Sequence, residues 1–392
     1  MRVGVDASCW ANPRGYGRFT RGLLTELLSR PPRHEFILLA DQATLEHSPW
    51  PLPAHAQRAT VKTCQSATGA ATASGRRSLG DIGAMARAVA GLGCDAFFFP
   101  SVYTYFPVRA CGRVLLGVHD IIAENYPAFV FPNRKHRLFW MIKGWLARRQ
   151  ADYIVTVSDY AGRSIARKFG WPQSRICVVG EAPDPVFRPI HDTARINRAL
   201  AAQGLEPGSR FLVCLGGLNP HKNLTALLEA LAGLRQTAEF AGVRLVLIGP
   251  AEDDTFTPGA AAVRAAIDRL GLHQVVRLTG YLADEEVACL LNAAQALVMP
   301  SLEEGYGLGA VEAAACGTPV IATRNSPLPL LLQGGGLFVD PHDVAELRGA
   351  LARLLAGDAL RCRLGRQAQE RAQGLTWGRA ADQFLTFLDT LS

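Results

Sequence analysis

The sequence has 392 residues, of which 49% are hydrophobic and 19% charged, and its formal net charge is +7. That length predicts two domains of about 150–200 residues, and the composition excludes a disordered chain. The positive charge suits nucleic acid, an anionic lipid surface or a phosphate-bearing substrate. Because the sequence carries no nucleic-acid-binding motif, we expect no nucleic-acid partner.

We expect neither a membrane span nor a bound metal. No apolar run approaches the roughly 18–20 residues that cross a bilayer. Met1-Arg2 leads directly into strand-like residues, so no signal peptide is expected. The nine cysteines are scattered and never form Cys-x-x-Cys, which favours reduced thiols in the cytoplasm and argues against zinc. A clean Asp-x-Asp at a strand end is also absent, so we expect no metal cofactor.

Short apolar runs alternate with helical patterns along the whole chain, which predicts an α/β fold with parallel sheets. In the first half the predicted strands are Val3–Val5, Phe36–Ala40, Ala96–Phe99, Val114–Val118 and Tyr153–Thr156. The predicted helices lie near Arg18–Ser29 and Gly80–Gly91. The small and polar residues of Ser66–Ser78 predict a loop.

The first strand is followed by a glycine-containing segment, Asn12–Thr20. Gly15 and Gly17 would allow close backbone approach, and Arg18 could meet an anion. A dinucleotide-binding dehydrogenase is excluded by pattern, because the full Gly-x-Gly-x-x-Gly is absent and no acidic residue follows at the expected distance.

Further candidates follow the next strands of the first half. His119 and Asp120 come after Val114–Val118, where a histidine could donate to a sugar oxygen or support developing charge. Tyr103 and Tyr105 follow Ala96–Phe99 and are candidates, with Arg18 and Asp120, for contacts to an acceptor. A lone histidine is more often structural, and the adjacent Asp120 favours the functional interpretation.

The segment Asn125–Ala151 has no acidic residue and interleaves basic with large apolar side chains. The basic members are Arg134, Lys135, Arg137, Lys143, Arg148 and Arg149. Such a pattern suits a helix on anionic lipid, with Trp140 and Trp145 inserted, or a lipid-linked diphosphate acceptor. A helix that packs on the core with a solvated basic edge explains it equally well.

The second half repeats the alternation after a segment interrupted by prolines, Pro183–Pro207, which we take as the seam between two domains. The predicted strands are Phe211–Leu215, Leu245–Ile248, Val276–Leu278, Ala296–Met299 and Val320–Ala322. The predicted helices are Leu224–Leu234, Asp284–Asn292, Leu308–Cys316 and Val344–Ala356, and Trp377–Leu391 has an amphipathic helical pattern.

A glycine pair and a lysine lie between a strand and a helix in Leu215–Leu224. Gly216 and Gly217 let the chain turn, and Lys222 stands near a helix N-terminus with its unsatisfied N–H groups. Such a lysine could neutralise a leaving diphosphate in a water-poor site.

The most informative segment is Ser301–Glu312, where Glu304 and Glu312 are separated by seven residues. Gly305, Gly307 and Gly309 let backbone amides approach an anion, and the helix starting at Leu308 adds its positive end. This combination suits a sugar joined to a diphosphate: Glu304 for sugar hydroxyls, N–H groups for phosphate and Glu312 for ribose hydroxyls.

Glu304-x7-Glu312, with the tail Ala313–Ala322, resembles the retaining glycosyltransferases with the two-Rossmann GT-B fold, the glycosyl transferases group 1 (family 4). The lysine loop and the His119-Asp120 pair also resemble this family. The resemblance implies an acceptor-side domain over residues 1–190 and a nucleotide-sugar donor domain over 191–375. A C-terminal helix over 376–392 would pack back on the first domain, and the two sheets would face each other across a cleft.

Catalytic roles are then implied for His119, Lys222 and Glu304. Donor contacts are implied for Gly15, Gly17, Gly217, His221, Lys222, Leu278, Glu304, Gly305, Tyr306, Gly307, Leu308 and Glu312. Three departures stand out. Gly217 replaces an arginine found in many members, and Gly309 replaces a proline. Gly180-Glu181-Ala182-Pro183-Asp184 replaces a common Pro-Asn-Gly-Val-Asp.

The implied reaction moves a hexosyl group, mannosyl or glucosyl, from a GDP- or UDP-sugar to a hydroxyl acceptor, with retention and without metal. A bacterial cell-envelope polysaccharide, exopolysaccharide or glycolipid is the implied product, made in the cytoplasm or on the cytoplasmic membrane face. Two alternatives remain open at this point: a sugar-nucleotide epimerase on the same fold, and a catalytically silent partner subunit.

Overall fold

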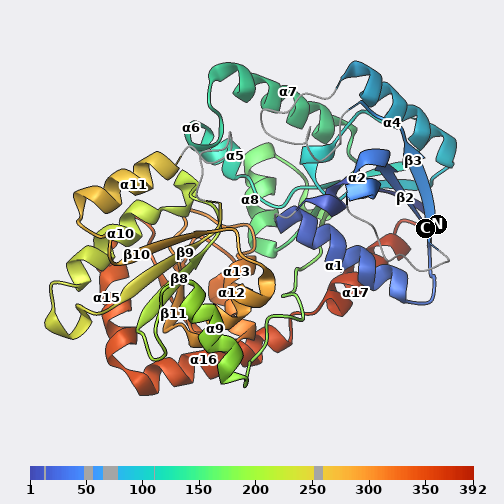
Figure 1. Cartoon of the computed structure of the whole chain (residues 1–392). Coiled ribbons are helices and arrows are strands. Elements are labelled where there is room, and N and C mark those ends of the chain that lie inside the picture. Colours follow the sequence, from blue (N-terminus) through green and yellow to red (C-terminus); the bar gives the residue numbers. More distant parts are fainter. Residues whose placement is uncertain (13–14, 48–55, 65–77, 110, 251–258) are drawn as a thin grey trace. The chain divides into compact units, whose positions relative to one another are not determined.

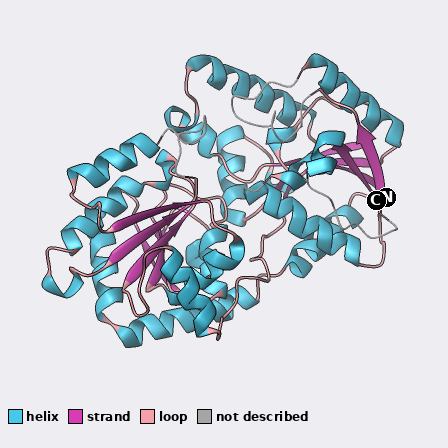
Figure 2. Ribbon diagram, in the orientation of Figure 1, coloured by secondary structure: helices cyan, strands magenta, loops and turns pink. Residues whose placement is uncertain are grey.

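The computed structural model describes residues 1–12, 15–47, 56–64, 78–109, 111–250 and 259–392. The loop expected over Ser66–Ser78 lies almost wholly outside these ranges. The chain forms two compact units, Met1–Glu181 with Thr376–Ser392 (unit 1) and Ala182–Leu375 (unit 2). Helices lie on both sides of the strands in each unit (Figures 1 and 2).

The sheet of unit 1 has seven parallel strands in the order β3-β2-β1-β4-β5-β6-β7. Their bounds are β1 Arg2–Asp6, β2 Glu35–Asp41, β3 Gln57–Val61, β4 Ala96–Phe99, β5 Arg113–Gly117, β6 Tyr153–Thr156 and β7 Ile176–Val178. Among the described residues, the helices of eight residues or more are α1 Gly15–Ser29, α4 Leu79–Leu92, α7 Arg134–Gln150, α8 Asp159–Phe169 and α17 Trp377–Asp389. Two short helices, α5 Ile122–Asn125 and α6 Pro127–Val130, precede α7.

The sheet of unit 2 has six parallel strands in the order β10-β9-β8-β11-β12-β13. Their bounds are β8 Phe211–Leu215, β9 Arg244–Ile248, β10 Val276–Gly280, β11 Ala296–Met299, β12 Val320–Thr323 and β13 Gly336–Val339. The main helices are α9 Thr193–Ala202, α10 Leu224–Leu234, α11 Ala260–Arg269, α12 Asp284–Ala293, α13 Leu308–Ala315, α15 Val344–Ala356 and α16 Asp358–Gln373. The predicted α/β fold with parallel sheets is confirmed.

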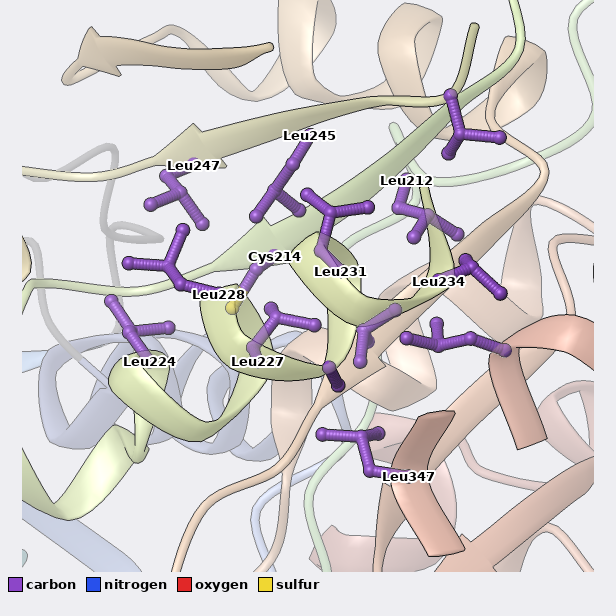
Figure 3. Close-up of a cluster of buried hydrophobic side chains, with 14 of the residues drawn as sticks. Leu212, Cys214, Leu224, Leu227, Leu228, Leu231, Leu234, Leu245, Leu247 and Leu347 are labelled. Atoms are coloured by element: carbon purple, nitrogen blue, oxygen red, sulfur yellow. The ribbon is translucent and has the colours of Figure 1, made fainter. Parts of the chain in front are cut away.

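Leucines at helical spacing form the core of unit 2. Helix α10 turns Leu227, Leu228, Leu231 and Leu234 toward strand side chains that include Leu212, Cys214, Leu245 and Leu247, and Leu347 of α15 joins them (Figure 3). All of these side chains are buried. This packing fixes the start of α10, and with it the loop that precedes the helix.

Helix α17 follows unit 2 in the sequence but packs within unit 1, beside α1 (Figure 1). A Cβ at Gly22 of α1 would lie 2.1 Å from the Trp377 ring. The Phe384 ring lies 4.9 Å from that of Phe98 in β4, and Arg30 forms an ion pair of 2.5 Å with Asp382. Close ring packing and charge pairing thus hold the C-terminus on this unit.

The first stretch of unit 1 ends at Glu181, just before the segment Pro183–Pro207 that we took as the seam. Regular structure is not interrupted throughout this segment, because α9 forms between Pro189 and Pro207. Asp192 caps this helix by accepting from the Arg195 amide at 2.9 Å. Prolines at both ends of a segment therefore leave room for a capped helix of about three turns between them.

Candidate active site

Two loops of unit 2 follow adjacent strands at the point where the strand order reverses. β8 and β11 pair with each other, while the chain continues from β8 to β9 on one side and from β11 to β12 on the other. Ligands of open parallel sheets bind beyond the carboxyl ends of strands at such a switch point. We call residues 216–223, after β8, the lysine loop and residues 300–307, after β11, the acidic loop.

Side-chain and backbone contacts join the two loops. Lys222 Nζ lies 2.7 Å from Glu304 Oε1, between residues 82 positions apart. The Leu302 amide donates to the His221 carbonyl at 2.8 Å, and Asn223 Nδ2 donates to the Pro300 carbonyl at 3.2 Å. Asn223 has a φ of 56°, which asparagine tolerates better than most residues. The loops are therefore joined by both side-chain and backbone hydrogen bonds.

Glu304 is buried and ionised. Its Oε1 accepts from both Lys222 and the Ser301 hydroxyl, the latter at 2.6 Å. Burial by itself would raise the pKa of Glu304, but the charge of Lys222 and these hydrogen bonds outweigh it and hold the pKa below its usual range. The pair therefore contributes stability above the ordinary glutamate pKa, and that contribution is lost as pH falls through the lowered pKa.

Two helices begin at these loops, and neither start is capped by a side chain. α10 begins after Asn223, whose amide group is used on Pro300 and Pro341. α13 begins after Gly307, whose φ of 88° requires glycine and where a Cβ would lie 2.7 Å from Leu328. The first-turn amides of both helices are thus suited to bind an anion.

The remaining donor-side candidates lie in α13, in the acidic loop and in the edge strand β10. Glu312 is buried in α13 at 5% exposure, and Tyr306 and Gly305 are buried in the acidic loop. Leu308 is the first residue of α13, and Leu278 is half-buried in β10.

Gly217 and His221 belong to the lysine loop. Gly217 follows Gly216, where a Cβ would lie 3.3 Å from Lys222 Cε, so the loop packs against the lysine stem. Burial, followed by the charge of Lys222, lowers the pKa of His221 to about 4. His221 is therefore neutral at pH 7, and Lys222 carries the positive charge of this loop.

His119 of unit 1 lies after β5 with most of its ring buried. Its Nε2 lies 2.9 Å from the Pro100 carbonyl, and Phe19 meets the ring edge-on at 4.7 Å. Burial lowers the pKa of His119 to about 4, so the ring is neutral at pH 7. Because a carbonyl oxygen only accepts, Nε2 carries the proton and Nδ1 is left as an acceptor. The expectation that this histidine donates to a sugar is thereby corrected, since its N–H is used within the protein.

Gly15 and Gly17 differ in what surrounds them. A Cβ at Gly17 would lie 1.9 Å from the Asn12 carbonyl oxygen, whereas one at Gly15 would meet nothing within 4 Å. Gly17 is therefore required by packing of α1 against the preceding turn, which corrects its interpretation as a residue that admits a ligand. Gly15 is exposed, and Arg18 is half-buried on α1.

The acceptor-side candidates separate into exposed and buried residues. Tyr105 is 6% exposed, and its hydroxyl donates to Gln150 at 2.9 Å, so it is a core residue and not an acceptor contact. Tyr103 is half-buried and stacks on Tyr16 at 5.3 Å. Asp120 is exposed and accepts from the Ile122 amide at the start of α5.

Three residues were missed by sequence reasoning: Ser301, Asn223 and Glu181. Asn223 bonds across the two loops, to the Pro300 carbonyl, so its role depends on a contact between distant segments. Ser301 bonds within the acidic loop, to the Glu304 oxygen that also accepts from Lys222. Glu181 is 5% exposed, and its Oε1 lies 3.9 Å from His119 Nδ1. The signal for Glu181 was present, because Gly180–Asp184 departs from the segment common in the resembling family.

Within the described ranges, no cluster of three or more His, Cys, Asp or Glu side chains is placed to hold a metal ion. The same residues include no helix long and apolar enough to cross a membrane.

Two units, each with a parallel sheet in doubly wound strand order and with paired lysine and acidic loops in unit 2, define the GT-B class of fold. The family model for glycosyl transferases group 1 matches residues 196–371, and that for glycosyltransferase family 4 matches residues 13–185. The chain therefore belongs to the group 1 glycosyltransferases of the GT-B fold.

Curated relatives carry the name D-inositol 3-phosphate glycosyltransferase. The protein from Corynebacterium efficiens is 32% identical over 236 residues, which cover 59% of this chain and 55% of the relative. The protein from a Nocardioides species is 35% identical over 248 residues, which cover 60% and 53%. The matched region thus spans little more than half the length of these relatives.

Solved structures share the fold at lower identity. Sucrose-phosphate synthase from Thermosynechococcus elongatus has a TM-score of 0.74 and 18% identity, covering 100% of this chain and 98% of its own. HepE from Anabaena, solved with UDP and glucose, has a TM-score of 0.71 and 20% identity, covering 99% of each chain.

Proposed function

We propose that the protein is a retaining hexosyltransferase that moves a mannosyl or glucosyl group from a nucleotide-diphosphate sugar to a hydroxyl acceptor. The observation that carries the proposal is the Lys222–Glu304 pair between two uncapped helix starts. The Lys222 ammonium and the first-turn amides of the two helices are suited to bind phosphate. The Glu304 carboxylate beside them is suited to accept from hydroxyl groups. UDP or GDP is the proposed nucleotide, and HepE, of the same fold, was solved with UDP-glucose.

In the proposed reaction the bond between the anomeric carbon and the diphosphate oxygen breaks through an oxocarbenium-like state. The acceptor hydroxyl attacks from the face that the diphosphate leaves, and its proton passes to the leaving phosphate oxygen. Lys222 and the first-turn amides of α10 and α13 stabilise the charge that develops on the diphosphate. No enzymic nucleophile is needed, and the anomeric configuration is retained.

The two carboxylates and His119 have separate roles in this proposal. Glu304, whose Oε1 holds Lys222 and Ser301, orients the lysine and accepts from sugar hydroxyls. Glu312 accepts from the ribose hydroxyls. Neutral His119 offers Nδ1 as an acceptor for a hydroxyl. The relatives' name suggests a polyol phosphate as one kind of acceptor, and a cell-envelope saccharide, including a lipid-linked one, is another.

The proposal is tested by screening UDP-, GDP- and ADP-hexoses for protection against thermal unfolding, followed by NMR of the glycosylated product. We expect one nucleotide sugar to raise the unfolding midpoint, and the product to keep the donor's anomeric configuration. An inverted product would overturn the mechanism. Isomerisation of the nucleotide sugar in the absence of acceptor would instead indicate an epimerase. If the donor binds but no turnover is detected, the protein would be a catalytically silent partner subunit.

Replacing Glu312 with alanine should weaken binding of the nucleotide sugar and of the free nucleoside diphosphate alike. The expected loss is about 1–3 kcal/mol, the cost of a charged hydrogen bond to ribose. Titration calorimetry with the free nucleoside diphosphate measures it. Glu285→Ala, an exposed position on α12 of the same unit, is the control, and equal affinities for the two variants would reject the assignment.

The reaction should proceed without a divalent cation, because Lys222 and two helix starts supply the positive charge that a metal would otherwise bring to the diphosphate. We expect initial rates in excess chelator to match those with added magnesium or manganese. A rate that chelator abolishes and either metal restores would show that a cation bridges the phosphates.

A further inference from the structure

Helix α7 presents an unusually apolar outer face. Of its residues, Leu138, Phe139, Met141, Ile142, Trp145 and Leu146 are each between 40% and 58% exposed. At 3.6 residues per turn these six positions fall within an arc of roughly 160° along the middle of the helix. Phe129 of α6, 37% exposed, is a further apolar side chain close in sequence. Such clustering is what marks an interaction surface on a soluble domain.

The opposite side of α7 is anchored in unit 1. Trp140 is 8% exposed, its Nε1 donates to Glu124 at 2.9 Å, and its ring lies 4.9 Å from that of Tyr103. Ala147 is fully buried in the core below. The expectation that Trp140 inserts into lipid is therefore wrong, whereas Trp145 is 56% exposed on the outer face. Because the inner face is held by packing, the outer face is a fixed feature and not a result of fraying.

Basic side chains stand at both ends of the apolar arc. Arg134 and Lys135 are exposed in the first turn and Arg149 in the last, with Arg137 exposed along one edge. No acidic residue occurs in α7. We call the six apolar residues with these four basic ones the α7 face. Its charge is of one sign, and long basic side chains can keep their charge at the level of lipid headgroups while their stems lie on hydrocarbon.

We propose that the α7 face docks the protein on an anionic lipid bilayer, with helix α7 lying in the plane of the headgroups. The apolar arc would enter the boundary of the acyl chains and the basic ends would meet lipid phosphates. A second copy of the chain fits less well, because pairing two such faces brings basic ends of like sign together. This inference does not rest on the proposed reaction, and its failure would leave that reaction untouched.

Flotation with neutral phosphatidylcholine vesicles and with vesicles containing phosphatidylglycerol tests the proposal. We expect the wild type to bind the anionic vesicles only, and binding to weaken as salt shortens the Debye length below about 10 Å. Arg134→Glu with Arg137→Glu should weaken the partition on the order of 25-fold or more, since each basic residue near such a surface is worth about fivefold. Arg363→Glu with Arg366→Glu, exposed on α16, changes the net charge equally and should retain most binding.

The apolar contribution is tested by Met141→Ser with Trp145→Ser, against Leu79→Ser, a still more exposed apolar position on α4. We expect only the first pair to lose binding, with unfolding midpoints close to wild type because the side chains are exposed. In a third variant, Trp145→Leu, binding should persist while quenching of tryptophan fluorescence by brominated lipid falls.

Two results would overturn the proposal. One is a wild type that fails to float with anionic vesicles at low salt. The other is vesicle binding unaffected by both pairs of α7 substitutions, while sedimentation shows that the same substitutions dissociate a dimer, since the face would then cover a second copy.

Discussion

Replacing Lys222 with alanine is expected to lower turnover by about 10²-fold or more while the protein stays folded. The reason is that the ammonium group stabilises charge on the leaving diphosphate, and loss of one such group from a preorganised site has an effect of this size. Binding of the nucleotide sugar should fall less than turnover, because the developing charge is largest in the transition state. Initial rates at saturating donor measure the effect.

The contact between Lys222 and Glu304 complicates a single substitution. Lys222→Ala removes the cation and also leaves a buried carboxylate without its partner at 2.7 Å. The double variant Lys222→Ala with Glu304→Gln separates the two effects, because a neutral amide removes the stranded charge. If Lys222 acts on the diphosphate, the double variant stays about 10²-fold below Glu304→Gln alone.

A double variant as active as Glu304→Gln would instead show that Lys222 serves only to neutralise Glu304. Lys168→Ala in unit 1 is the control, because it also removes a lysine ammonium that forms hydrogen bonds, here to Glu124 and Asn125. We expect its turnover to match that of the wild type. A Lys222→Ala enzyme with near wild-type turnover would mean that another cation holds the phosphates. Arg18 would be the next residue to replace, because His221, with its pKa lowered to about 4, is neutral at pH 7.

The sequence predicted the inner strands of both sheets almost to the residue, and it missed three strands at the edges. β3, β7 and β13 each lie at the end of a sheet. Their burial is partial, with only one buried residue in each. A strand covered on both faces must be a continuous apolar run, whereas an edge strand can carry polar residues, as β3 does. β7 and β13 are short apolar runs, of three and four residues, that we did not recognise as strands.

The sequence likewise predicted some features of the candidate site and missed others. Lys222, Glu304 and Glu312 stand out in the sequence, because glycines and helix starts surround them. The Lys222–Glu304 contact was not predictable, since it depends on β8 and β11 being adjacent although the chain visits β9 and β10 between them. Tyr105 and Trp140 were misassigned because a large aromatic after a strand or on a basic helix has the same sequence pattern whether it is buried or exposed.

Gly249, which follows β9, approaches the backbone of the lysine loop closely. Its φ is 147°, and a Cβ there would lie 2.3 Å from the Gly216 carbonyl oxygen and 3.1 Å from the Gly217 amide nitrogen. Both contacts are to backbone, so neither can be relieved by rotating a side chain. The close approach of the two strand ends therefore fixes the first residues of the lysine loop.

Gly249→Ala is consequently expected to destabilise unit 2 by roughly 3 kcal/mol, from the unfavourable φ together with overpacking against Gly216. For a unit of this size that is a fall in the unfolding midpoint of roughly 6–12 °C. The relevant transition is the one that a nucleoside diphosphate shifts to higher temperature in the wild type. Affinity for the nucleotide should fall as well, because the Gly216 and Gly217 backbone must move.

Gly271→Ala is the matched control for this prediction. Gly271 also has a positive φ, 64°, but a Cβ there would meet nothing within 4 Å. We expect it to cost about 1–2 kcal/mol from backbone conformation alone, with no change in nucleotide affinity. Equal losses of stability from the two variants would mean that the approach of Gly249 to the lysine loop relaxes without cost. The rigid connection inferred between β9 and the phosphate-binding residues would then be wrong.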